Sequence, residues 1–217
     1  VGTVGHPADQ NLSAGTGTFT GDVTIGDASA ADKKILFDGN AQDFHIGLDD
    51  SSDSLTIGLG STLGTTSHMI FDANGHITKP LQPAFSAKAT NDQTNIAVGS
   101  NVTLVLDSER FDQNGDFSSN TFTAPVTGKY QLQTVVYFQN LDSASTVYNV
   151  KITTSNTDYQ APFDPDFGQD NGYWGWGFSI LADMDANDTA YVFVRQTGGT
   201  QQTDLANSSY FSGYLVA

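Results

Sequence analysis

The sequence predicts an all-β protein, and three observations support that prediction. Nearly all of the 24 acidic residues are aspartate, because Glu109 is the only glutamate. Aspartate favours turns and caps, whereas glutamate favours helix interiors. Threonine, valine, glycine and asparagine are abundant, as in strands joined by tight turns. Apolar residues recur at every second position in several short runs, which is the spacing of strands, and no stretch has a convincing helical period.

Residues 1–80 form a region of short repeats. Its opening is rich in glycine, serine and threonine and lacks a core, so we expect a flexible N-terminus. Short strand-like units that end in a glycine or aspartate turn then recur at residues 23–26, 35–39, 44–47, 55–58 and 69–75. Such units cannot bury their apolar faces alone and must stack on neighbours. The alternative is a set of β-hairpins that pack on the same protomer.

Pro80 and Pro83 mark the boundary with a second domain at residues 81–217, because two prolines this close make a stiff, extended joint. Beyond it the runs have the spacing of a β-sandwich. We expect strands at residues 85–87, 102–106, 130–138, 147–154, 176–181, 190–195 and 210–216, and a tight acidic turn at 183–188. An antiparallel jelly roll of roughly eight to ten strands fits, since two closed sheets limit exposed edges.

The alternation also predicts the core of this second domain. Trp176, Phe178 and Ile180 are two residues apart and should share one face of a strand. The side chains expected to pack in the same core are Phe122, Tyr130, Leu132, Phe211 and Leu215. Gly175 and Gly177 leave the other face of the strand bare, so the backbone of another chain could approach it. A bulge within one protomer is the alternative reason for these glycines.

Residues 111–130 combine a polar turn, formed around Asp112, with a rigid corner at Pro125. The corner runs from Phe122 through Gly128 to Tyr130, and the chain ends in SSYFSGYLVA. In that order, these two signatures resemble the globular head of the complement q-subunit and its tumour-necrosis-factor-like relatives, over residues 82–217. The resemblance implies a jelly-roll head and a homotrimer.

Three phrases of the first region, GTGTFTGDVTIGD, DDSSDSLTIG and FDANGHIT, resemble the intertwined shafts of bacteriophage tail fibres. This resemblance implies a trimeric shaft. The expected fold is therefore all-β, with a C-terminal antiparallel jelly-roll sandwich preceded by a short-strand, trimeric and intertwined β shaft.

Charge and composition exclude several classes of function. The net charge is −16, and only 8 lysines and arginines could neutralise phosphates, so we expect no nucleic-acid partner and no attraction to anionic membranes. No apolar run approaches the length of a transmembrane helix, no signal peptide is visible, and we expect no membrane insertion. Without cysteine there are neither disulfides nor thiolate metal sites, so stability must come from packing or oligomerisation.

No catalytic constellation is apparent, and we expect that the protein is not an enzyme. All four histidines, which are His6, His45, His68 and His76, precede residue 80, so the second domain has no histidine base. Neither a G-x-S-x-G elbow nor a Walker loop occurs. Adjacent aspartates could hydrolyse glycosides, but in a chain so rich in aspartate such pairs arise by chance.

Calcium is the one cofactor that the acidic loops could bind, since it takes six to eight oxygen ligands. The better candidate ligands are Asp164, Asp166 and Asp170. Asp112 and Asp116 begin like a calcium loop, but Phe117 takes the place of the required glycine and no glutamate closes the loop. We therefore interpret that second segment as a structural turn.

Residues 158–174 are the candidate receptor-binding loop. Its aromatic residues are Tyr159, Phe163, Phe167, Tyr173 and Trp174. Aromatic faces stack on sugar rings, while carboxylates accept hydrogen bonds from sugar hydroxyls or hold a bridging calcium ion. Binding residues concentrate on loops of a rigid sandwich. The alternative is that these aromatics pack onto the head or fill the seam of a trimer.

The sequence thus predicts a homotrimeric fibre-tip adhesion protein. In a phage it would be a tail-fibre or receptor-binding protein of the virion that recognises a host-surface glycan or protein, with other fibre or virion proteins as partners. Three weak sites on one axis would raise avidity. The alternative is an extracellular trimerisation or capping domain that ends a fibre without a receptor of its own.

Overall fold

The computed structural model describes residue 16 and residues 18–217. All regular structure in this part of the chain is β-strand, which confirms the predicted all-β class. The described residues accordingly contain no helix that could cross a membrane. The chain divides into two compact units, one holding the chain up to Thr66 with Ile70–Ile77, the other holding Ser67–Met69 with Thr78–Ala217. The predicted boundary after residue 80 stays a prediction.

Most of the regular structure of the first unit belongs to one sheet, whose strands follow one another in chain order. These strands are β1 (Lys33–Phe37), β2 (Phe44–Asp49), β3 (Ser54–Leu59), β4 (Ser67–Phe71) and β5 (Ile77–Thr78). Each strand from β1 to β4 overlaps one of the predicted repeat units, whereas the unit at residues 23–26 lies in no strand. That three copies of this unit intertwine to form a shaft stays a prediction.

The second unit, the head, is built from two antiparallel sheets. The first sheet has the order β13 (Asp158–Phe163), β12 (Ser145–Thr154), β15 (Thr189–Gly198), β10 (Thr121–Thr123) and β9 (Phe117–Ser118), with β7 (Asn101–Thr103) on β15. The second has the order β14 (Asn171–Met184), β11 (Gly128–Leu141), β17 (Tyr210–Leu215), β6 (Ala84–Lys88) and β8 (Ser108–Asp112), with β16 (Asp204–Leu205) on β11.

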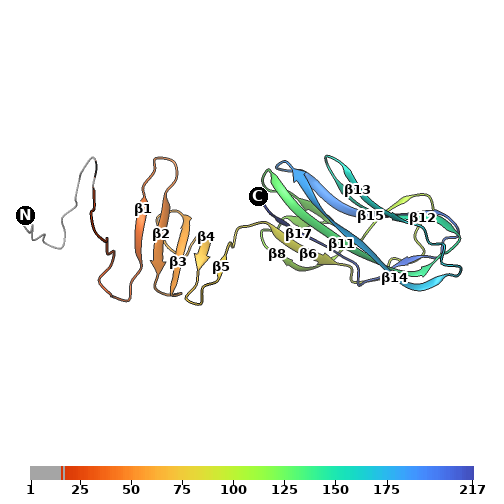
Figure 1. Cartoon of the computed structure of the whole chain (residues 1–217), viewed down its shortest axis with the longest axis horizontal. Helices are drawn as coiled ribbons and strands as arrows, with labels where there is room; N and C mark the ends of the chain where they lie inside the picture. The colour runs from red at the N-terminus through yellow and green to blue at the C-terminus, as the bar shows by residue number, and fades with distance from the viewer. Residues whose placement is uncertain (1–15, 17) are drawn as a thin grey trace, which may run out of the picture. The chain divides into compact units, whose positions relative to one another are not determined.

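The two head sheets lie face to face, and successive long strands alternate between them (Figure 1). This alternation is the connectivity of a jelly roll. The core between the sheets holds the predicted residues: Phe122, Tyr130, Leu132 and Phe211 are fully buried, and Leu215 packs against them. Phe85 stacks on Phe117 at 5.0 Å and on Phe122 at 4.7 Å between ring centroids, so aromatic contacts join the sheets.

The corner that carries the sequence resemblance has a physical explanation. The Tyr130 hydroxyl donates a hydrogen bond to the Val126 carbonyl oxygen at 2.8 Å, which closes the chain back on itself. Burial raises the pKa of Tyr130. A Cβ atom on Gly128 would lie 2.6 Å from the Ala217 carbonyl oxygen, so only glycine lets the end of the chain pass this closely.

The strand expected at residues 102–106 is shorter than predicted. It ends at Thr103, and after one more backbone hydrogen bond, from the Leu104 amide to the Val192 carbonyl oxygen at 2.9 Å, side-chain amides replace the sheet ladder. The Val105 amide donates to Gln93 Oε1 at 2.8 Å, and the Leu106 amide donates to Asn120 Oδ1 at 2.7 Å. A period-two pattern predicts the extended chain but not which partner takes its hydrogen bonds.

Candidate functional site

The segment at residues 158–174 is less of a loop than the sequence suggests. Its first part is β13 and its last part begins β14, so only residues 164–170 connect the two strands. Because β13 is an edge strand, Pro162 can lie within it without removing a needed hydrogen bond. The rigid strand ends therefore fix the direction of most of the aromatic side chains predicted to bind a receptor.

Two of the predicted receptor residues face inward. Phe163 is buried in the core, where it stacks on Tyr148 with the ring centroids 5.4 Å apart. Tyr159, four residues earlier on the same face of β13, is half-buried against that core. Period two places both side chains on the covered face of the strand. Phe163 is therefore a packing residue, which corrects its assignment to the receptor surface.

The other three predicted aromatics are all more exposed than Phe163. Phe167 lies against Trp174, with 4.8 Å between ring centroids, and 38% of its surface is exposed. Tyr173 is 80% exposed, the most of any aromatic residue in the head. Trp174 is half-buried, and its Nε1 atom is buried without a hydrogen-bond partner. The structure thus brings Phe167 and Trp174 together, whereas Tyr173, next to Trp174 in the strand, points from the opposite face of β14.

The three candidate calcium ligands do not form a metal-binding group in the described residues. Asp170 accepts hydrogen bonds from the Ser143 amide at 2.9 Å, the Ser143 hydroxyl at 2.8 Å and Gln202 Nε2 at 2.8 Å. The bond from the Ser143 amide, with those from Gln202 and the Ser143 hydroxyl, lowers the pKa of Asp170. Asp164 accepts from the Asp166 amide at 3.1 Å, as in a turn. Calcium at these aspartates stays a prediction.

The segment at Asp112 is the structural turn that we expected. Its two carboxylate oxygens accept hydrogen bonds from the amides of Asp116 at 3.0 Å and Phe117 at 2.9 Å. Burial and the neighbouring Asp112 carboxylate raise the pKa of Asp116. This turn holds the backbone in place before β9.

A hollow of about 380 Å³ lies over the paired strands β11 and β14. Tyr137 and Gln139 on β11 line it together with Tyr173 and Trp174 on β14, and the turn at residues 206–208 closes it. Tyr137 lies opposite Gly175 in the ladder, and a Cβ atom on Gly175 would approach the Tyr137 ring to 3.2 Å. The glycine thus leaves room for the ring to lie flat.

The turn that closes the hollow is held firmly. The Ala206 amide donates to the Tyr137 carbonyl oxygen at 2.7 Å, and the Asn207 amide donates to Asp92 Oδ1 at 2.7 Å. The hollow thus combines exposed aromatic faces with the amide groups of Gln139 and Asn207 on a rigid frame. The sequence alone did not indicate Tyr137, Gln139 and Asn207 as site residues, because they are far from residues 158–174 in the chain.

The outer faces of β14, β11 and β17 carry no charge over their middle, and Lys88 lies opposite Tyr210 on the adjacent strand β6. Their outward side chains there are Gln131, Gln133, Val135, Tyr137, Ser179, Leu181, Tyr210, Ser212 and Tyr214. Leu181 and Tyr214 are 56% and 52% exposed. Charges appear at their end, where Lys129 pairs with Asp183. On a chain of net charge −16, an uncharged face this broad is unusual.

Packing within one protomer explains the glycines of β14. A Cβ atom on Gly177 would lie 2.3 Å from the Thr134 carbonyl oxygen, and one on Gly175 would crowd Tyr137. Close packing inside the sheet therefore requires Gly177 without any second chain. Trp176, Phe178 and Ile180 pack against the core from the other face of β14, as predicted.

No protein-family model matches the sequence, and no curated protein has significant similarity to it. Among solved structures, the globular domain of zebrafish complement 1qA protein is 18% identical, with 63% of this chain and 98% of that chain covered and a TM-score of 0.44. Murine APRIL, crystallised at pH 8.0, is 8% identical, with 62% and 99% covered and a TM-score of 0.47. The jelly-roll assignment accordingly rests on the strand order of this chain.

Proposed function

We propose that the chain is a homotrimeric attachment protein, in which residues 1–80 form a fibre shaft and residues 81–217 form the head that contacts a host-surface glycan. As a phage tail-fibre or receptor-binding protein it would act on the virion, outside the host cell. We assign it no catalytic role, since the head contains no histidine.

One observation carries the binding part of this proposal: Tyr173 stands 80% exposed on a rigid strand beside an aromatic hollow. An exposed aromatic ring on a strand loses no hydrogen bond and little conformational entropy when a sugar ring stacks on it. Gln139 and Asn207 supply amide donors and acceptors for sugar hydroxyls at the same hollow. Sites of this kind bind weakly one at a time, so three on one assembly raise avidity.

The uncharged part of the outer face that lies away from the hollow, around Gln131, Gln133 and Tyr214, supports the homotrimer. Interface centres are depleted of charge and enriched in tyrosine. Around Tyr214 and Phe111 the same face holds a second hollow of about 280 Å³, lined by Gln131, Gln133 and Gly213 among others. This face favours a second candidate function as well, a structural cap that ends a fibre by trimerisation alone.

The glycan proposal is tested with the purified chain on a printed array of bacterial surface polysaccharides and animal glycans. We expect binding to at least one glycan and its loss in Tyr173→Ala. The matched control is Tyr191→Ala, because Tyr191 lies half-exposed on β15 of the opposite sheet. Absence of binding by the unmodified chain, or equal losses in both variants, would contradict the glycan site and leave the structural cap.

The homotrimer is tested separately by light scattering at micromolar concentration. The expected mass is three times the chain mass of 23.0 kDa. Tyr173→Ala should keep that mass. A smaller mass in this variant, with glycan binding intact, would place the hollow in the contact between copies instead.

A further inference from the structure

The sheet of the first unit has its faces reversed relative to an ordinary protein. On β2, the covered side chains are His45 and Asp49 with Gly47 between them, while Phe44 and Leu48 are exposed. On β3, Ser54 and Thr56 are covered and Leu55 is exposed. The polar and glycine face is thus buried, and the apolar face points to solvent in the single chain.

Close packing fixes this orientation. The segment at residues 60–66 covers the polar face, where a Cβ atom on Gly47 would lie 2.9 Å from Leu63 and one on Gly58 would lie 2.5 Å from the Thr66 carbonyl oxygen. His45 Nδ1 lies 2.8 Å from the Gly60 carbonyl oxygen on the same side. If the pairing register of the strands slipped by one residue, the apolar face would become the covered one. Large side chains would then clash with the segment that packs closely against the glycines.

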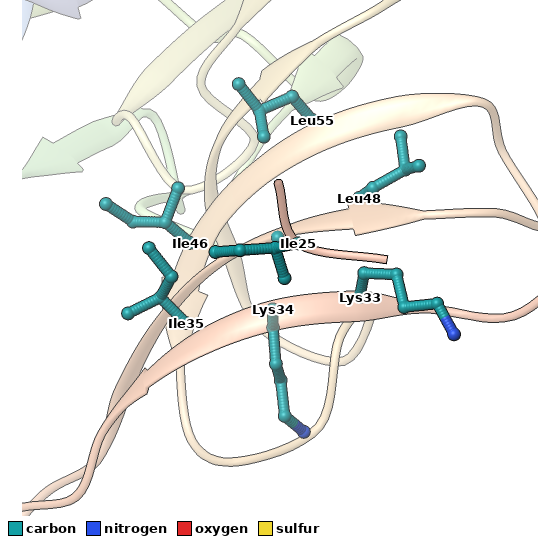
Figure 2. A pocket seen from close by; sticks show the side chains of 8 residues that line it. Ile25, Lys33, Lys34, Ile35, Ile46, Leu48 and Leu55 are labelled. Carbon is teal, nitrogen blue, oxygen red and sulfur yellow. The ribbon is translucent and has the colours of Figure 1, made fainter. Parts of the chain in front are cut away.

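The exposed face consists of apolar rows that cross the strands. Ile35, Ile46 and Ile57 are register partners on β1, β2 and β3, and Phe37, Phe44 and Leu59 form a parallel row. Figure 2 shows Ile35, Ile46 and Leu48 on this face, with Ile25 from the preceding segment lying among them. Even with Ile25 there, the exposed fractions of Ile35, Phe37, Phe44, Leu48 and Leu55 are between 42% and 55%.

The area of this exposed apolar face is large enough to indicate that a binding partner covers it. Five such side chains offer on the order of 400–500 Å², which is already near the largest apolar patch of an ordinary monomer. With the half-buried Ile46, Ile57 and Leu59 added, the face approaches the roughly 800 Å² per partner of a specific interface. Left in water, it would favour aggregation.

Charge indicates which partner. The rows on β1, β2 and β3 contain no carboxylate, although the chain carries 24 acidic residues, and Lys33 at their margin is paired with Asp27 at 3.0 Å. Two chains of net charge −16 can approach closely only through a face without acid. A basic partner would instead be drawn to the aspartates elsewhere on the surface.

We propose that this apolar face packs against the same face of other copies of the chain. The inference rests on the homotrimer proposed above and names the surface that holds the shaft together. The rows run across the strands, so three copies with their sheets facing inward would bring the rows of Ile35, Ile46 and Ile57 together along one axis. The packed apolar rows would then form a continuous core that no single chain possesses.

Introduced thiols test this arrangement in the full chain, because the protein has no cysteine of its own. Ile46→Cys and Ile57→Cys place one thiol on the central row. Thr62→Cys is the matched control, since Thr62 is exposed in the segment that covers the opposite face. Each variant is treated with a short bismaleimide at low protein concentration and examined on a denaturing gel, and circular dichroism checks that it folds.

We expect covalently linked pairs of chains from Ile46→Cys and Ile57→Cys, and only background linkage from Thr62→Cys. Each thiol makes one link, so one chain of a trimer stays unlinked. A trimeric mass without linkage at either row position would overturn this inference and leave the homotrimer standing. Equal linkage in the control would also overturn it, by indicating random collision, and a monomeric mass would overturn both proposals.

Discussion

Replacing Trp176 by alanine tests the assigned faces of β14. The side chain is half-buried against the head core, its ring centroid lies 5.2 Å from that of Phe163, and its Nε1 atom donates to the Ala161 carbonyl oxygen at 2.9 Å. If about 150 Å² of the ring leaves water on folding, burial contributes roughly 4 kcal/mol at 25 cal/mol per Å². The hydrogen bond adds about 1 kcal/mol.

Trp176→Ala should therefore destabilise the head by about 3–5 kcal/mol. For a domain of this size, that loss lowers the melting temperature by roughly 10 °C. Trp176→Phe keeps most of the apolar contact and should cost about 1–2 kcal/mol. Tyr173→Ala, on the exposed face of the same strand, should change stability by less than about 0.5 kcal/mol.

The assay is thermal unfolding followed by circular dichroism, with all variants at one protomer concentration because assembly would shift the midpoint. The expected order of melting temperatures is wild type and Tyr173→Ala together, then Trp176→Phe, then Trp176→Ala. If Trp176→Ala melted with Tyr173→Ala, the even-numbered residues of β14 would not face the core, and the assigned register would be wrong.

Three further outcomes are expected. Tyr130→Phe leaves the Val126 carbonyl oxygen without its donor and should cost about 1–2 kcal/mol in urea unfolding; an unchanged midpoint would mean that water replaces the hydroxyl. Gly177→Val should prevent folding of the head or yield insoluble protein, because its Cβ atom would overlap the Thr134 carbonyl oxygen; soluble protein with the wild-type melting temperature would contradict this packing. Hydrogen bonds hold the pKa of Asp170 below its ordinary value, so the stability that the ionised carboxylate contributes is present above about pH 4 and is lost as the pH falls further. In Asp170→Asn the loss of stability on acidification should therefore be smaller than in the wild type. An identical dependence of stability on pH in the two proteins would exclude Asp170 as a contributor.

Local patterns in the sequence determined much of the head. Period-two alternation identified the strands at β11, β12, β14, β15 and β17 and the buried residues Phe122, Tyr130 and Leu132. These patterns suffice because side chains two residues apart share a face of any strand. The corner from Phe122 to Tyr130 was equally predictable from the sequence, since proline fixes its own backbone angle and glycine allows close approach of another segment.

Only the tertiary structure decided which of two faces is covered. Phe163 belongs to the core because β13 pairs with β12 at the sheet edge, and the hollow exists because β11 and β14 bring Tyr137 beside Tyr173. In the first unit, the glycines at 47 and 58 let a loop cover the polar face and leave the apolar rows outside. A period of two separates the faces of a strand, but their burial depends on contacts between residues distant in the chain.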